Sequence, residues 1–167
     1  MLDKLQAVKN RYDELCFRSE QADFYNDPKK AAVLLRERND LEPIIETYDR
    51  YRRAESDMED AQALMSDPEM KEFCQEAFQS AKEKSEELYE RIKAEALAGH
   101  NDDVMQSVVS REAGKYSGKE RVDYMINIQV PFLEEHNFPL SLGYTWFWAG
   151  WSYACENEIE NAIVCFN

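Results

Sequence analysis

Glycine is scarce in this chain and unevenly placed. The 167 residues contain five glycines, and all of them lie between Gly99 and Gly150. Because glycine is the usual residue where a backbone needs a tight turn or a positive φ angle, its absence before Gly99 favours long helices there. The distribution predicts a boundary close to Gly99, which divides the chain into domains of residues 1–98 and 99–167.

Cysteine and histidine are too few and too scattered for a metal site. The four cysteines form no CxxC pair, and neither histidine lies at a metal-ligand spacing from them. We therefore expect free thiols, no metal and no other cofactor. The sequence also lacks an apolar N-terminal signal segment and any apolar run of the roughly 20 residues that span a bilayer. These features predict a cytoplasmic protein without membrane association.

Basic residues are in deficit throughout. Lys and Arg number 20 against 34 Asp and Glu, which gives a net charge of −14. Since affinity for nucleic acid comes mainly from Lys and Arg that neutralise phosphates, this composition argues against DNA binding and against broad contact with RNA. The partners that we expect are proteins.

No pattern typical of catalysis is present. The chain has no GxSxG motif, and Gly114–Lys119 lacks the spacing of a phosphate-binding loop, so we interpret it as a turn between helices. Acidic pairs such as Asp102-Asp103 are better explained as helix caps than as a general acid and base, because nothing indicates a pocket that would separate their pKa values. The sequence predicts no catalytic residue and no enzyme.

What the sequence does contain is helical periodicity over its first 98 residues. A first helix is expected from about Leu2 to Gln21. The segment Phe24–Pro28 combines turn formers with a proline suited to open a second helix, in which Pro43 predicts a kink or a short break near Asp40–Glu42. Apolar residues at spacings of three and four mark these helices: Leu2, Leu5, Val8, Tyr12 and Leu15 in the first, and Leu34, Leu41, Ile45, Tyr48, Tyr51, Met58 and Met65 in the second.

A third helix is expected from Pro68 to about Ala96, with Ser66 or Asp67 as its N-terminal cap. The short link to the second helix requires it to fold back antiparallel. Its predicted apolar positions are Met70, Cys74, Ala77, Ala81, Leu88 and Ile92. The fold class that follows is all-α, with an antiparallel, coiled-coil-like three-helix domain first.

The second half is rich in aromatic residues and is expected to form a small helical domain. Residues 119–135 favour a helix, although Ile126–Val130 alternates as a strand would. The segment 144–167 resembles a tetratricopeptide helix pair, in which small residues let two helices approach and Asn157 takes a left-handed turn. The positions that carry this resemblance are Trp146, Ala149, Gly150, Tyr153, Ala162 and Phe166.

The aromatic run from Tyr144 to Trp151 is too dense for one helix face. Five large rings in eight residues must point in several directions, so some are expected to form an apolar surface. Such a surface either packs on the first domain or binds a protein partner, and the sequence leaves both readings open. For the second reading, Trp148 and Trp151 are the candidate binding residues.

Four short segments of the first half resemble the N-terminal helical domain of the bacterial peptide chain release factor 1 family: MLDKL at the start, LEPI at Leu41–Ile44, SDPEMKE from Ser66 and AKEKSEEL from Ala81. The resemblance covers about residues 1–98. It implies a domain that docks on the ribosome toward the stalk proteins. The sequence has no Gly-Gly pair for the family's hydrolytic Gly-Gly-Gln loop, and no proline begins its stop-codon tripeptide of the Pro-x-Thr type.

Two functions are therefore predicted. In the first, the chain is a non-catalytic binding protein of translation termination whose ribosome contacts include Lys71, Lys82 and Lys84. In the second, it is a tetratricopeptide-like adaptor with no ribosomal role, which binds its partner through Trp148 and Trp151.

Overall fold

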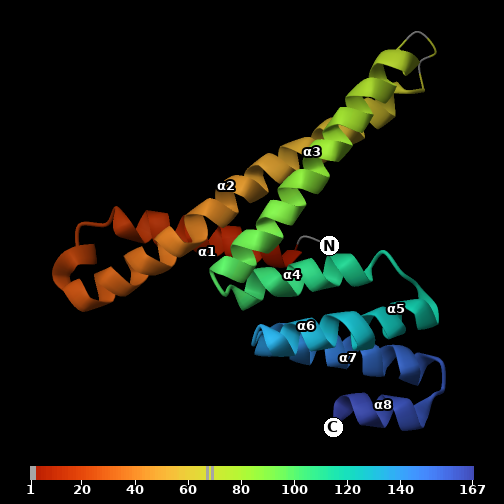
Figure 1. Ribbon diagram of the computed structural model, residues 1–167. Helices are drawn as coiled ribbons and strands as arrows, with labels where there is room; N and C mark the ends of the chain where they lie inside the picture. The colour runs from red at the N-terminus through yellow and green to blue at the C-terminus, as the bar shows by residue number, and fades with distance from the viewer. Residues whose placement is uncertain (1–2, 67, 69) are drawn as a thin grey trace. The chain divides into compact units, whose positions relative to one another are not determined.

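The computed structural model describes residues 3–66, 68 and 70–167, and every regular element among them is a helix (Figure 1). The all-α prediction is confirmed. By their contacts the residues group into two compact units: Lys9–Glu95, which we call the hairpin unit, and Met1–Val8 with Ala96–Asn167, which we call the aromatic unit. The predicted domain boundary near Gly99 stays a prediction.

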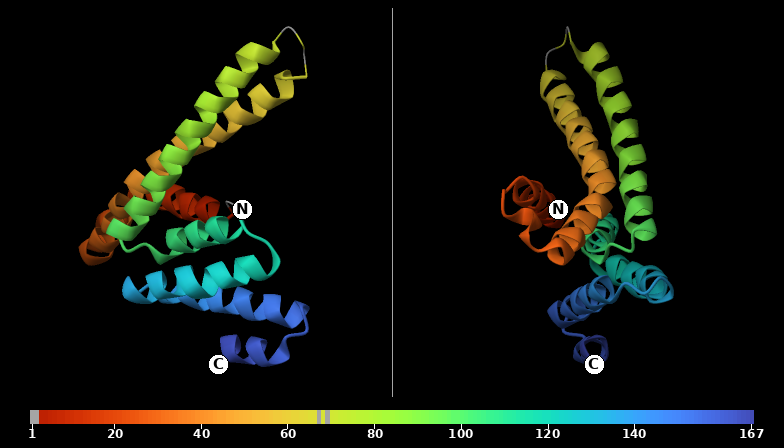
Figure 2. Two further views of the ribbon diagram at one scale, coloured as in Figure 1. Left: turned by 45° about the vertical axis from the view of Figure 1, so that its right-hand side comes forward. Right: turned by 90° about the vertical axis from the view of Figure 1, so that its left-hand side faces the viewer.

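Two long antiparallel helices dominate the hairpin unit. They are α2 (Pro28–Leu64) and α3 (Lys71–Ala98), which lie side by side in all views (Figures 1 and 2). A shorter helix, α1 (Asp3–Ser19), is followed by the 3-10 turn η1 (Phe24–Asn26). Ion pairs join α1 to α2: Nζ of Lys9 lies 2.8 Å from Asp49, and the Arg11 guanidinium contacts both carboxylate oxygens of Glu37, at 2.7 and 2.9 Å.

The start of α2 agrees with the sequence, and the short break predicted near Asp40–Glu42 is absent, while the alternative of a kink there stays a prediction. Asp27 accepts hydrogen bonds from the backbone N–H groups of Lys29 and Lys30, and Pro28 occupies the first turn, where a missing N–H costs nothing. The helix then runs unbroken through Pro43. The buried residues that follow at once, Ile44 and Ile45, show why: packing of this face outweighs the one backbone hydrogen bond that proline removes.

The start of α3 is later than predicted. The helix begins at Lys71, and the N–H of Cys74 bonds to the carbonyl of Met70 at 2.9 Å, so Pro68 precedes the helix instead of opening it. The proposed cap at Ser66 or Asp67 falls partly outside the described residues, which exclude Asp67. A longer link suits the geometry, because two antiparallel helices need several residues to reverse direction.

The predicted apolar seam is confirmed over most of its length. Buried as expected are Leu5, Val8, Leu15, Leu41, Ile45, Tyr48, Tyr51, Cys74, Ala81, Leu88 and Ile92. Half-buried are Tyr12, Leu34, Met58, Met65 and Ala77, while Met70 is exposed and Leu2 lies outside the described residues. Polar contacts also cross between the long helices: the buried hydroxyls of Ser85 and Thr47 donate to Glu55 and Glu95. Knobs-into-holes packing stays a prediction.

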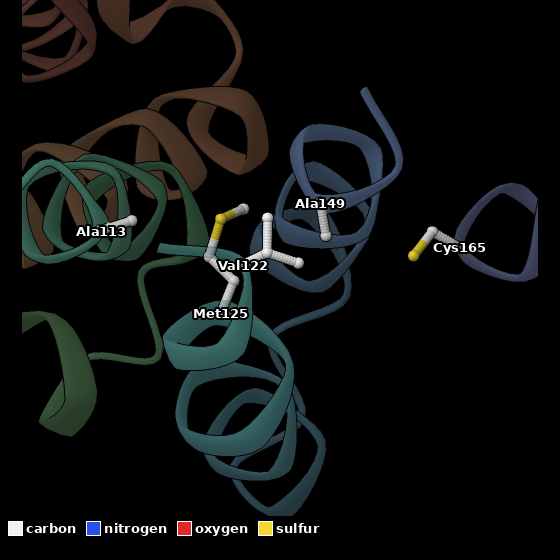
Figure 3. Close-up of a cluster of buried hydrophobic side chains, with 5 residues drawn as sticks. All are labelled: Ala113, Val122, Met125, Ala149 and Cys165. Atoms are coloured by element: carbon white, nitrogen blue, oxygen red, sulfur yellow. The ribbon is translucent and has the colours of Figure 1, made fainter. Parts of the chain in front are cut away.

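The aromatic unit is a set of shorter helices. In order they are α4 (Asp102–Ala113), α5 (Gly118–Tyr124), η2 (Met125–Gln129), α6 (Val130–Glu135), α7 (Pro139–Cys155) and α8 (Ile159–Phe166). Helix α7 contacts α4, α5, η2, α6 and α8, so it is the central element (Figure 1). Its buried cluster consists of Ala113, Val122, Met125, Ala149 and Cys165 (Figure 3).

The expected helix over residues 119–135 is confirmed, and the alternating pattern of its middle is not a strand. Residues 125–129 form a turn of π-helix, in which the N–H of Val130 bonds to the carbonyl of Met125. Pro131 follows directly and has no N–H to give to Asn127, so the helix widens by one residue before it resumes as α6. The buried amide of Gln129 donates to the carbonyl of Val109 at 2.7 Å.

Asp102 is a helix cap, as predicted, but it caps a helix distant in sequence. It lies in the first turn of α4, whose own cap is Asn101. Its carboxylate accepts hydrogen bonds from the N–H groups of Leu140 and Ser141, at 2.7 and 2.9 Å, and from the Ser141 hydroxyl at 2.5 Å. These are the otherwise unpaired donors at the start of α7, so the contact fixes α7 against α4.

Candidate functional site

The three candidate lysines on α3 are all exposed, but they do not share one surface. Eleven residues make about three helical turns, which places Lys71 and Lys82 on the same face of α3. Lys84 is two residues further, about 200° around the helix, and faces elsewhere. Two of the three predicted cations therefore share one face of α3, about three turns apart.

A hollow of about 930 Å³ lies beside Lys71, near the end of the α2–α3 hairpin. Its lining carries one ammonium group against three carboxylates, from Glu72, Glu76 and Glu83, together with the apolar side chains of Met65 and Phe78. The sequence did not predict this hollow, which forms where Met65, just after α2, lies beside residues of α3.

Large apolar side chains are also exposed at this end of the hairpin, in the last turn of α2 and around the start of α3. Leu64, Met70 and Phe73 are 52%, 39% and 68% exposed. An acidic hollow flanked by apolar side chains fits a protein partner better than nucleic acid, whose phosphates the carboxylates would repel. This surface, with Lys71 and Lys82, is the first candidate site.

The aromatic run on α7 divides between core and surface, as the presence of five large rings in eight residues predicted. Trp146 packs against the buried cluster of the aromatic unit, and the Tyr144 hydroxyl lies 3.3 Å from that of Ser110. Phe147, Trp148 and Trp151 remain 50%, 36% and 53% exposed. The run therefore supplies both core and surface, and the exposed rings are the second candidate site.

Helices α7 and α8 approach closely where the sequence places small residues. A Cβ atom on Gly150 would lie 2.8 Å from the Phe166 ring and 3.0 Å from Cβ of Cys165. Ala149 and Ala162 are buried, and Asn157 adopts a φ of 63° in the turn, as predicted. Phe166 differs from expectation, since it is 52% exposed and does not fill the interior.

The thiol and the phenol inside this hairpin are not activated as nucleophiles. Burial raises the pKa of the Cys165 thiol, which therefore stays protonated at neutral pH and packs as a small apolar group. Burial likewise raises the pKa of the Tyr153 phenol. His136 lies at the end of α6, as predicted, and its Nδ1 is 2.9 Å from the carbonyl of Phe132.

Within the described ranges, no group of three or more His, Cys, Asp and Glu side chains is placed to hold a metal ion. No described helix is both long and apolar enough to cross a membrane.

Comparison with known proteins agrees with the resemblance of the first half. Peptide chain release factor 1 of Agathobacter rectalis is 34% identical over 117 residues, which are 68% of this chain and 33% of that protein. The same factor of Bacillus subtilis is 29% identical over 132 residues, 77% of this chain and 36% of that protein. The chain thus spans about a third of the length of the curated relatives it matches. No solved structure matches it.

The family match defines which part of the chain is shared. It extends over residues 8–129 and includes all of α2, α3, α4, α5 and η2, whereas α6, α7 and α8 follow it. The first candidate site lies inside the matched region and the exposed rings of α7 lie outside it. With well over half of its residues matched, the chain belongs to the PCRF domain family.

Proposed function

We propose that this protein is a binding protein of translation termination, which docks on bacterial ribosomes in the cytoplasm through the α2–α3 hairpin. The observation that carries the proposal is the PCRF domain match over residues 8–129, together with relatives named peptide chain release factor 1. Because these 167 residues contain neither a Gly-Gly pair nor a Pro-x-Thr tripeptide, their proposed role is docking, without stop-codon reading or peptidyl-tRNA hydrolysis.

The proposed contact surface is the first candidate site. Lys71 and Lys82 stand on one face of α3, and Lys71 lines the acidic hollow together with the apolar side chains of Met65 and Phe78. An apolar anchor with a few charges around it is the usual composition of a protein interface. We therefore expect contact with ribosomal protein, at or near the stalk, more than with rRNA. Lys84 lies on another face and is expected to contribute less than Lys82.

Co-sedimentation with bacterial ribosomes, in competition with intact release factor 1, tests the proposal. The chain is expected to pellet with ribosomes and to be displaced by the intact factor. Lys71→Glu with Lys82→Glu should weaken pelleting at least about tenfold, as loss of a central interface contact does. Lys29→Glu with Lys30→Glu is the matched control, because it makes the same charge change on two exposed lysines at the start of α2.

The possible outcomes of the co-sedimentation experiment distinguish docking through this surface, docking through another part of the hairpin, and no ribosome binding. Pelleting that the control pair retains and the α3 pair loses supports docking through this surface. Pelleting that neither pair changes would move the contact elsewhere on the hairpin. Failure of the unaltered chain to pellet at low salt would overturn the ribosomal role.

A second candidate function rests on a different observation, the exposed rings of α7. In this alternative the chain is a tetratricopeptide-like adaptor, and Trp148 and Trp151 contact the partner. Trp151→Ala should then abolish partner binding and leave ribosome pelleting unchanged.

A further inference from the structure

The α7–α8 hairpin carries two exposed apolar stripes. On α7, Leu140, Phe147 and Trp151 follow one another at intervals of seven and four residues and are 60%, 50% and 53% exposed. On α8, Ile159, Ile163 and Phe166 follow at intervals of four and three and are 52%, 54% and 52% exposed. These intervals place each set on one side of its helix.

The two stripes meet on the same side of the hairpin. The ring centroids of Phe147 and Phe166 are 6.1 Å apart, and the Phe166 ring lies directly over Gly150. The residues that face the interior, Ala149 and Cys165, belong to the buried cluster (Figure 3). The outer rings are therefore not used by the core, and together they form one surface across two helices, which we call the apolar face.

Charge on this hairpin is of one sign. Residues 139–167 contain Glu156, Glu158 and Glu160 and no Lys, Arg or His. All three carboxylates lie at or next to the turn between α7 and α8, at one end of the apolar face. A recess of about 400 Å³ at this turn is lined by residues 157–161, including Glu158 and Glu160. It offers space for a long cationic side chain beside two carboxylates.

These features select the kind of occupant. Two antiparallel helices with apolar stripes on one side present the groove into which a third helix packs in a bundle. The acidic turn favours basic residues at one end of that helix and disfavours an anionic membrane surface. A second copy is disfavoured as well, because it would add another net charge of −14 and no cation from its own hairpin.

We propose that the apolar face of α7–α8 binds an amphipathic helix of another protein, whose apolar stripe ends in basic residues that lie against Glu156, Glu158 and Glu160. This proposal does not depend on ribosome docking, since the apolar face lies outside the region that matches the PCRF domain family.

Fluorescence anisotropy with a designed probe tests it. The probe is a labelled peptide of about 18 residues without tryptophan, with leucines at helical spacing and about four lysines at one end. Two comparison peptides have the same composition in scrambled order, or glutamates in place of the lysines. The lysine peptide should bind at least about tenfold more tightly than either, and the protein's tryptophan emission should shift to the blue as Trp151 is covered.

Variants of the full chain locate the binding surface. Trp151→Ala and Ile163→Ala should each weaken the lysine peptide at least about tenfold, whereas Ile128→Ala removes an equally exposed side chain on η2 and should not. Glu158→Lys with Glu160→Lys should weaken the lysine peptide and strengthen the glutamate peptide. Circular dichroism of each variant checks that its helices remain.

Three results of the peptide experiments would overturn the proposal. The first is that the scrambled peptide binds as tightly as the lysine peptide. The second is that Glu158→Lys with Glu160→Lys does not reverse the preference between the lysine and glutamate peptides. The third is that the lysine peptide does not bind at about millimolar concentration. If sedimentation velocity shows a dimer that Trp151→Ala dissociates, the face belongs to a second copy and the proposal fails. Ribosome pelleting of Trp151→Ala, measured in parallel, separates failure here from failure of the docking function.

Discussion

The two helical hairpins of this chain, α2–α3 and α7–α8, use their apolar side chains in different ways. The long hairpin encloses one continuous apolar seam, in which Ile44, Tyr48 and Ile92 are each 1% exposed, and leaves apolar side chains such as Leu64 and Phe73 exposed only outside that seam. The short hairpin has a buried side and, in addition, an outer side on which Trp151 and Ile163 remain half exposed. The comparison shows that periodicity predicts where apolar residues line up, while the number of neighbouring helices decides how much of each stripe is covered.

The two hairpins also differ in their polar contacts. In the long hairpin the buried Ser85 and Thr47 pair with glutamates across the seam, and Arg11 and Lys9 join α1 to α2 by ion pairs. The short hairpin has no basic residue at all. Charged pairs therefore belong to the internal structure of the hairpin unit, whereas the carboxylates of the α7–α8 turn are exposed at the surface.

Replacing an isoleucine by alanine in each hairpin is expected to give the largest difference in the loss of stability. Ile92→Ala removes a buried side chain and leaves a cavity, which typically costs about 2–5 kcal/mol of unfolding free energy. Ile163→Ala removes a side chain that is 54% exposed and should cost less than about 1 kcal/mol. Urea denaturation followed by circular dichroism measures both. Similar costs would show that the apolar face is covered in solution.

A smaller effect is expected where α7 and α8 cross. Gly150→Ala places a Cβ 2.8 Å from the Phe166 ring and 3.0 Å from Cys165, so the ring must move and the helices must separate slightly. We expect a net loss of about 1 kcal/mol, because overpacking outweighs the better helix propensity of alanine.

Gly143→Ala is the matched control on the same helix, since a Cβ there would meet nothing within 4 Å. It should stabilise by about 0.5–1 kcal/mol. Thermal denaturation of the two variants checks the sign, and equal stabilisation by both would contradict the close crossing.

The smallest effect concerns the Arg11–Glu37 ion pair of the hairpin unit. The hydrogen bonds from Arg11 hold the pKa of the Glu37 carboxyl below its ordinary value of 4.5. A carboxyl whose pKa is lower in the folded state adds stability above its unfolded pKa and loses it as the pH falls through the folded value. Because the two side chains are 41% and 38% exposed, solvent screening limits this contribution to at most about 1 kcal/mol.

Unfolding of the wild type and of Glu37→Gln between pH 7 and pH 3 measures the contribution. The difference in stability between the two should be largest near neutral pH and should shrink in acid. Glu14→Gln is a useful comparison, because Glu14 makes a single contact with Arg11 from the same helix. A difference that grows in acid would have the wrong sign for this pair.

Much of the fold could be predicted because its signals are local. The start of α2 at Asp27-Pro28, the helical seam and the left-handed Asn157 follow from residue types and spacings within a few positions. The signals that failed were also local. Pro43 indicated a kink or a break, yet α2 is continuous there, and Pro68 indicated a helix start, yet α3 begins at Lys71.

The candidate sites were only half predictable. The sequence singled out Trp148 and Trp151, but it missed Leu140 on the same helix and Ile163, which joins Trp151 only when α7 and α8 pack. The spacing of Leu140, Phe147 and Trp151 was a usable signal. The cap that Asp102 provides for α7 could not be predicted from the sequence, because 38 residues separate Asp102 from Leu140 and no local pattern links them.

By itself, the sequence determined that this protein is helical, acidic and built around apolar stripes, because these properties depend on composition and on spacing within one helix. Only the tertiary structure decided which rings of the aromatic run pack on the core and which are exposed. Trp146 and Trp151 differ little as residues in a sequence, yet one packs on the core and the other remains exposed. The physical reason is that burial depends on which helices lie beside a side chain, and in α7 those helices come from distant parts of the chain.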